Sequence, residues 1–244
     1  TPDGREVYFT QRKEGEPNRL MMSRLGTDGW TAPEPAAFAK GFPDAEPHVT
    51  PDGRALYFGS RRPQPGSARS DDGIWVVTRT AGGTWGAPRY HGPGMYVSSA
   101  RSGNLYITDV TNATGTGEGA AIVYPWTAGK FGRPQRLGGG VNTPRVADHV
   151  FVAPDESYIL LDSTRPGGQG GEGDLYACFR RPDGSWSEAV NLGDVVNAPG
   201  TTFCPSVSPD GRYIFYTANN DIYWVSAKIL EPLRARVLGA GSAR

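Results

Sequence analysis

The side chains best suited to binding a ligand occupy one position in a pattern that recurs along the chain. Aligning the chain on its recurring turns places four residues at that position: Glu46, Met95, His149 and Cys204. Asp44 and Asp148 lie beside it, and Arg61 and Arg165 begin two variable loops. Together these carboxylate, imidazole and guanidinium groups suit a polar or anionic ligand. Glu46, Asp148 and His149 would also suit a divalent ion such as calcium.

Each candidate also has a structural interpretation, which stays open at this point. Glu46 could hydrogen-bond the backbone of a neighbouring repeat. His149, like His48, could be a histidine whose hydrogen bonds are satisfied within the fold. Arg61 and Arg165 could hold their own loops by donating hydrogen bonds to backbone carbonyls.

Sequence motifs for catalysis are absent. The chain has no Gly-x-Ser-x-Gly, P-loop, His-Glu-x-x-His or EF-hand run. Its three histidines, His48, His91 and His149, leave little room for a metal triad. We therefore expect no catalytic residue, no metal site and no resident cofactor, with a divalent ion such as calcium as the one exception to test.

A repeat of about 50 residues must position these side chains. A Pro-Asp-Gly turn or a close relative precedes a strand with aromatic or apolar residues at 2–4, 51–53, 154–156 and 209–211, with a degenerate copy at 101–103. A second strand signature begins at Asp72, Asp174 and Asp221. A Gly turn and an aromatic residue then follow, as at Gly184-Ser185-Trp186. Each unit is therefore predicted to be a four-stranded antiparallel meander.

One such meander cannot bury both of its faces, and radial stacking of the units solves this problem. We predict an all-β fold, a β-propeller of four-stranded antiparallel blades, as a single domain covering residues 1–244. The expected blades lie at about 1–43, 44–93, 94–145, 146–200 and 201–244. A long sandwich of irregular hairpins is the alternative. The period-two alternation and the many prolines exclude a helical solenoid.

The first repeat begins at its turn, so its innermost strand is missing. Two explanations stay open. The natural chain begins earlier, in which case upstream residues could add a sixth blade, or the segment Ala235-Arg236-Val237-Leu238 supplies a closing strand. We favour the first explanation.

The repeats resemble a known family. The Pro-Asp-Gly copies, with the runs Asn191-Leu192-Gly193, 204–211 and 221–225, are similar to the bacterial extracytoplasmic subset of the WD-repeat-like, TolB-type propellers. The resemblance covers essentially the whole chain, although the third unit has lost both Pro-Asp-Gly and the strand aspartate. It implies a secreted, periplasmic or lipid-anchored protein that acts as a binding module. It says little about activity, because propellers support many unrelated functions.

Charge and cysteine content exclude several classes of partner. Lys and Arg number 25 and Asp and Glu also number 25, so no net field favours nucleic acid. No apolar run approaches the roughly 20 residues of a membrane-spanning helix. Cys178 and Cys204 lack the spacing of a redox or zinc motif, and we expect two free thiols. We also expect a monomer.

The connections between strands divide the predicted blades into two faces. One face carries short Pro-Asp-Gly and Gly turns. The other carries long irregular loops around 61–70, 114–119 and 165–173, where binding usually lies. The leading hypothesis is therefore a non-enzymatic propeller that binds an envelope protein or a polysaccharide through its loop-rich face. The alternative is a hydrolase or lyase acting on glycan or peptide, with Glu46 as acid/base and His149 as its partner or as a metal ligand.

Overall fold

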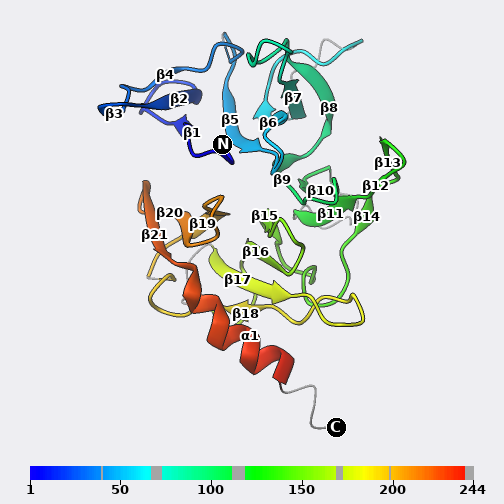
Figure 1. The fold of residues 1–244 in the computed structure, drawn as a ribbon. Coiled ribbons are helices and arrows are strands. Elements are labelled where there is room, and N and C mark those ends of the chain that lie inside the picture. Colours follow the sequence, from blue (N-terminus) through cyan, green and yellow to red (C-terminus); the bar gives the residue numbers. More distant parts are fainter. Residues whose placement is uncertain (40, 67–72, 112–118, 169–172, 198, 240–244) are drawn as a thin grey trace. The chain divides into compact units, whose positions relative to one another are not determined.

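Five sheets of short antiparallel strands account for most of the ordered backbone. The computed structural model describes residues 1–39, 41–66, 73–111, 119–168, 173–197 and 199–239. These form two compact units, Thr1–Val97 and Ser98–Arg244, which are described separately. Figure 1 labels the strands of both units.

The first unit contains two sheets. Its first sheet consists of β1 (Glu6–Gln11), β2 (Arg19–Gly26), β3 (Gly29–Trp30) and β4 (Glu34–Pro35), with both β3 and β4 paired to β2. Its second sheet has the order β5 (Asp44–Val49), β6 (Ala55–Ser60), β7 (Gly73–Thr78) and β8 (Arg89–Pro93). All of these pairs are antiparallel, as the meander pattern predicts. The strand β9 (Met95–Ser99) begins at the end of this unit.

The second unit holds the remaining sheets. The third sheet has the order β14 (Gln135–Arg136), β11 (Ala120–Tyr124), β10 (Leu105–Asp109) and β9, and β12 (Trp126–Thr127) pairs with β13 (Lys130–Phe131) as a separate hairpin. The fourth sheet has the order β15 (Asp148–Val152), β16 (Tyr158–Ser163), β17 (Asp174–Phe179) and β18 (Val190–Asn191). The fifth has three strands, β19 (Thr202–Val207), β20 (Tyr213–Ala218) and β21 (Asp221–Ser226).

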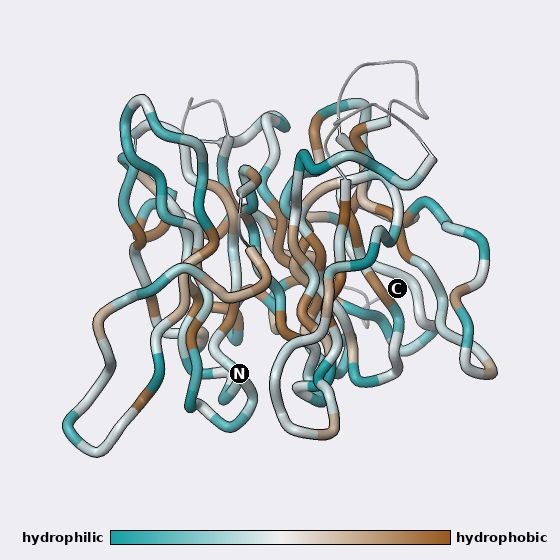
Figure 2. Tube along the Cα trace, turned by 90° about the horizontal axis from the view of Figure 1, so that it is seen from above, coloured by the Kyte–Doolittle hydropathy of each residue, from teal (hydrophilic) through white to brown (hydrophobic). Residues whose placement is uncertain are grey.

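Alternating side chains along β16 show how the sheets of the second unit stack. Ile159 and Leu161 pack in one core cluster with residues of the third sheet, such as Tyr106. Leu160, which lies between them in sequence, packs in another cluster with Ile214 of the fifth sheet. Because successive side chains of a strand point to opposite faces, both faces of the fourth sheet are buried. Figure 2 colours the backbone by hydropathy, with hydrophobic stretches in many extended segments and hydrophilic stretches at many of the turns that connect them.

The recurring turns have a backbone conformation that explains their glycines. Gly4, Gly53 and Gly211 have φ of 69°, 70° and 74°, a region that only glycine adopts freely. In the turn Pro154-Asp155-Glu156, the glutamate takes this position with φ of 58°. Its carboxylate Oε1 accepts hydrogen bonds from Asn104 Nδ2 at 2.9 Å and from the hydroxyl of Tyr106 at 2.5 Å. The strained residue thus links the fourth sheet to the third.

The C-terminal segment is helical, so the less favoured alternative of a closing strand at 235–238 is wrong. A short 3-10 turn, η1 (Ala227–Ile229), leads into the helix α1 (Leu230–Gly239). Leu230, Leu233 and Val237 pack against the cluster between the fourth and fifth sheets. Their spacing of three and four residues fits one face of a helix and not the alternation of a strand. No helix in the described part of the chain is long and apolar enough to cross a membrane.

We predict that Glu156→Ala lowers the free energy of unfolding by about 1–3 kcal/mol, because it leaves the buried Tyr106 hydroxyl without its acceptor. Glu156→Gln keeps an acceptor oxygen and should lose less. Adding Tyr106→Phe to Glu156→Ala removes both partners and should recover part of the loss. Urea denaturation of the four proteins checks this, and a Glu156→Ala variant as stable as the wild type would contradict it.

Candidate functional site

In four of the five repeats, one residue of the innermost strand has a backbone in the left-handed region. The pairing register shifts within β5, β15 and β19. Four non-glycine residues with positive φ lie at the equivalent position: Glu46 (55°), Tyr96 (48°), His149 (44°) and Cys204 (55°). A bulge re-aims its side chain, and a strained φ at a non-glycine residue persists only where surrounding contacts hold it.

The sequence alignment was wrong by one residue in the third repeat, where it placed Met95. The degenerate turn there begins at Arg101, and the same count that leads from Pro51 back to Glu46 leads from Arg101 to Tyr96. Without the Pro-Asp-Gly turn to fix the register, the alignment of that repeat had no anchor. The positions of Glu46, His149 and Cys204 agree with the repeat.

Glu46 makes a contact with the next innermost strand inside the first unit. Its backbone N–H donates to Thr10 Oγ1 at 2.9 Å, and its own Oε2 accepts from the backbone N–H of Tyr96 at 3.1 Å. The hydrogen bond from Tyr96 therefore supports the structural interpretation of Glu46. Its role in ligand binding stays a prediction.

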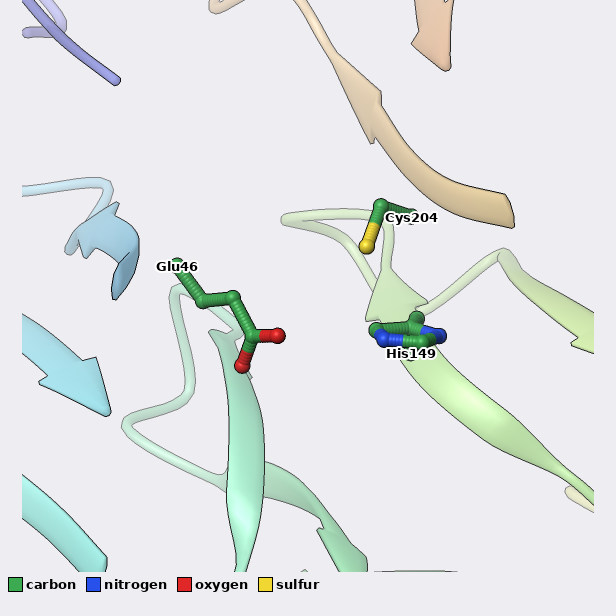
Figure 3. Close-up of side chains that lie close together, drawn as sticks. All are labelled: Glu46, His149 and Cys204. Atoms are coloured by element: carbon green, nitrogen blue, oxygen red, sulfur yellow. The ribbon is translucent and has the colours of Figure 1, made fainter. Parts of the chain in front are cut away.

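His149 lies between a carboxylate and a thiol within the second unit. Its Nδ1 is 2.8 Å from Asp162 Oδ1, and its side chain is 14% exposed. The side chain of Cys204 lies beside the same imidazole and helps to raise the pKa of His149. Figure 3 shows the Cys204 sulfur and the His149 ring turned toward a common space. Their possible metal-ligating atoms lie within 4.8 Å of one another.

The protonated form of His149 is favoured by these neighbours. Burial alone lowers the pKa of His149, but the negative charge of Asp162 and hydrogen bonds to Asp162 and Cys204 outweigh it and raise the pKa well above 6.5. His48 shows the opposite case, because burial lowers its pKa to about 4. Glu46, also labelled in Figure 3, belongs to the first unit, so its approach to His149 stays a prediction of the repeat alignment.

Asp162 is the residue that sequence reasoning missed. It lies in β16, directly after the aromatic and aliphatic residues Tyr-Ile-Leu-Leu and before the final serine. Its Oδ1 also accepts a hydrogen bond from the backbone N–H of Cys204 at 3.2 Å, so one buried carboxylate holds both His149 and Cys204. A lone carboxylate in an apolar strand was the signal, since such a charge requires partners inside the fold.

The two predicted aspartates, Asp44 and Asp148, differ in how deeply they are buried. Asp44 is fully buried in β5, and its Oδ2 accepts from Arg62 Nη2 at 2.6 Å. Burial raises the pKa of Asp44, although hydrogen bonds from Ser60 and Arg62 and the charge of Arg62 oppose this. Asp148 is partly buried in β15, opposite Asp162 in the strand register.

The two predicted arginines also differ. Arg165 is buried and donates to the carbonyls of Gly140 and Val141 at 2.7 and 2.8 Å, which fits its structural interpretation. Its counterpart in the second repeat is the buried Arg62, which follows Pro51 at the same interval, whereas Arg61 is exposed. A ligand contact by Arg61 or Arg165 stays a prediction.

The donor atoms that meet here bear on the choice of ion. An imidazole nitrogen and a cysteine sulfur suit softer ions such as zinc, whereas calcium prefers oxygen ligands. The pair of His149 and Cys204 therefore does not favour calcium. Binding of a divalent ion such as calcium through Glu46, Asp148 and His149 stays a prediction.

The outer edge of β21 is a second candidate site in the second unit. In the second, third and fourth sheets, the third strand pairs with a fourth strand. No strand of the described residues pairs with the equivalent edge of β21. Ile222, Tyr223 and Trp224 are 58%, 43% and 63% exposed there, whereas Leu175, Tyr176 and Ala177 are buried at the corresponding place in β17. Exposed apolar side chains along an unpaired strand edge are typical of an interaction site.

A cavity of about 590 Å³ adjoins the end of β21. Ser226 and Ala227, Lys228 and Glu231, and Tyr213 and Phe179 are among its lining residues. It is built from the last strands, η1 and α1, and from the turn between β15 and β16. The cavity extends the edge of β21 toward the helix.

Other predicted elements fall partly outside the described residues. Asp72 and residues 67–70, 114–118 and 169–172 of the variable loops lie there. Asp174 is buried, whereas Asp221 is exposed. Neither Cys178 nor Cys204 forms a disulfide, as expected, but only Cys178 is fully buried.

Comparison with known proteins shows the fold. No family model and no curated protein sequence matches the chain. The solved structure of TolB from Acinetobacter baumannii is 15% identical with a TM-score of 0.59, over 93% of this chain and 52% of that one. The structure of a putative TolB from Agrobacterium tumefaciens is 18% identical with a TM-score of 0.58, over 91% of this chain and 69% of that one. The chain thus spans about half the length of the first of these structures.

The predicted fold is confirmed. The chain is an all-β, TolB-like β-propeller with five blades, corresponding to the five sheets. In the described residues the fifth blade has three strands, so a fourth strand is missing from its outer edge.

We predict that His149 makes the stability of the protein depend on pH. Because the folded pKa of His149 is raised, its contribution is fully present below the ordinary value of 6.5 and is lost as the pH rises through the folded pKa. His149→Gln should therefore destabilise the protein at about pH 5.5 and progressively less toward pH 9. Urea denaturation across this range measures the effect.

His48→Gln is a comparison of opposite sign, because burial lowers the folded pKa of His48 to about 4 and only the unfolded chain takes up a proton as the pH falls below 6.5. His48→Gln should therefore destabilise the protein less at about pH 5.5 than at pH 9, the reverse of His149→Gln. A His149→Gln variant whose effect is constant across this range would contradict the assigned protonation.

Proposed function

We propose that this TolB-like β-propeller is an extracytoplasmic binding module for a protein partner. The partner would add an extended, apolar segment to the outer edge of β21. The observation that carries the proposal is the unpaired edge with the exposed Ile222, Tyr223 and Trp224. Addition of a strand to a sheet edge uses backbone hydrogen bonds for affinity and side-chain pockets for specificity.

The register of the other blades indicates what the edge accepts. In the fourth blade, Tyr176 and Ala177 of β17 pair with Asn191 and Val190 of β18 in antiparallel orientation. Tyr223 and Trp224 occupy the equivalent places in β21. An antiparallel segment of a few residues would therefore complete the blade as β18 does.

Two features favour a protein over a polysaccharide as the occupant. A strand edge offers backbone N–H and C=O groups in a repeating order that another extended backbone matches. The aromatic side chains are also already partly engaged within the sheet, since Tyr213 lies edge-on to Trp224 at 5.1 Å and Tyr216 stacks on Tyr223 at 6.0 Å. Apolar side chains of an incoming strand would extend these clusters.

The extracytoplasmic location belongs to the same proposal and is supported by the TolB-type sequence resemblance. Binding through the loop-rich face stays a separate prediction, because much of those loops lies outside the described residues. Replacing loop segments 61–70 and 165–173 separates the two possibilities. If β21 is the site, both replacements leave partner binding intact.

We predict that Ile222→Lys and Trp224→Lys each weaken partner binding at least about tenfold while the fold is retained, because an edge lysine opposes strand addition. A library of displayed peptides, selected on the wild-type protein, supplies the ligands, and fluorescence anisotropy measures their affinities. Trp30→Lys is the matched control, since Trp30 is 52% exposed on β3 in the first unit.

Three results would overturn the proposal. The selection could yield no peptide, or the selected peptides could bind the two β21 variants as well as the wild type. A soluble glycan whose binding depended on Trp224 in the same way would overturn the choice of a protein as the partner.

An enzymatic function has one observation in its favour. The carboxylate of Asp162 hydrogen-bonds the imidazole of His149, and the thiol of Cys204 lies within 4.8 Å of that ring. The glycan or peptide hydrolase with Glu46 as its acid/base is less well supported, because the Glu46 carboxylate already accepts a backbone hydrogen bond. Assays for turnover with Glu46→Gln and His149→Gln test this alternative.

A further inference from the structure

We propose that Cys204 is a nucleophilic thiol that His149 and Asp162 activate, and that it forms mixed disulfides with small disulfide molecules. This inference goes beyond the binding function and does not depend on it. It rests on three side chains from three neighbouring strands, β15, β16 and β19, all within the second unit.

The carboxylate of Asp162 fixes the geometry of the pair. Its Oδ1 lies 2.8 Å from His149 Nδ1 and 3.2 Å from the backbone nitrogen of Cys204. The same oxygen therefore orients the imidazole and holds the backbone that carries the thiol. A nucleophile, a base and a third group that orients the base are the elements of an activated nucleophile.

The contact between thiol and imidazole provides the activation. The Cys204 sulfur and a His149 ring nitrogen lie within 4.8 Å of each other, so the thiol proton can pass to the ring. The product is a thiolate beside an imidazolium, and Asp162 stabilises the imidazolium by its negative charge. The thiolate, and not the thiol, is the nucleophile.

The strained backbone keeps these groups together. His149 and Cys204 both have positive φ, at 44° and 55°, on bulges of adjacent blades. His149 and Phe203 also contact through their rings, with centroids 5.8 Å apart. A bulge that only ended a strand would not require a carboxylate, an imidazole and a thiol to converge.

The second cysteine supplies an internal comparison. Cys178 is fully buried in β17, and burial raises the pKa of its thiol to about 12. Cys204 is only partly buried. The chain therefore contains one thiol placed to react and one that burial keeps inert.

The reaction balances without a further reagent. The thiolate of Cys204 attacks one sulfur of a small disulfide and forms a new S–S bond. The old S–S bond breaks, and its electron pair leaves with the departing thiolate. That thiolate takes the proton held by His149, so the net change converts Cys204 and a disulfide into a mixed disulfide and a free thiol.

The test measures the rate at which the native protein reacts with a chromogenic aromatic disulfide at about pH 7, with peptide mass mapping to locate the product. We expect one rapidly modified residue, Cys204, and no modification of Cys178 in the folded protein. His149→Gln should slow the reaction about tenfold, and Asp162→Asn should also slow it. Oxidised glutathione should give the same order of rates.

A second measurement separates activation from misfolding. The ultraviolet absorbance of a thiolate at neutral pH should be present in the wild type and in Cys178→Ser, and lost in Cys204→Ser and His149→Gln. Circular dichroism confirms that each variant is folded. The proposal is overturned if Cys204 reacts no faster than free cysteine, if folded His149→Gln reacts as fast as the wild type, or if thiolate absorbance is absent.

Discussion

The structure depends on the fact that a single small sheet has two apolar faces. In β16, Ile159 and Leu161 belong to one core and Leu160 to another. Removing that strand would therefore damage two clusters. The chain solves the problem by repeating the same meander, and each blade gains its stability from its neighbours. Polar groups inside the stack must then find partners across blades, as Glu156 does with Tyr106.

The same constraint creates the candidate site. The innermost strands carry bulges that turn a side chain out of the regular alternation, and the N–H of the bulged residue can bond an acceptor on the preceding blade. The Thr10 hydroxyl accepts from the N–H of Glu46, and the Glu46 carboxylate accepts from the N–H of Tyr96. The Asp162 carboxylate accepts from the N–H of Cys204. In the last case the acceptor carboxylate, Asp162, also contacts His149, which lies on the bulge of the same blade. The hydrogen bond between Asp162 and Cys204 is therefore part of a polar group that also includes His149.

Much of the fold could be predicted from the sequence, because the recurring turns indicate where each meander begins. The Pro-Asp-Gly copies require a left-handed third residue, which Gly4, Gly53 and Gly211 supply. The third repeat lacks that turn, and there the alignment chose Met95 in place of Tyr96. The helix at 230–239 was missed because the apolar residues of a short segment do not distinguish a helix from a strand. The outer edge of β21 depends on which strands pair, and pairing is not visible in composition.

The site was predicted only in part. Repeat alignment found Glu46, His149 and Cys204, because a shared backbone position can be counted along the chain. It did not find Asp162, whose importance lies in its distances to His149 and Cys204. It also chose Arg61, while the buried guanidinium belongs to Arg62. Side-chain packing decides between such neighbours, and a sequence pattern carries no information about it.

The central claim is that Asp162 holds His149 as an imidazolium beside Cys204. Nitrogen NMR of the labelled imidazole at about pH 7 tests it directly, because ring nitrogen shifts report both protonation and tautomer. We expect both ring nitrogens of His149 to be protonated in the wild type, and the ring to become neutral in Asp162→Asn. A neutral ring in the folded wild-type protein, unchanged in Asp162→Asn, would contradict the claim.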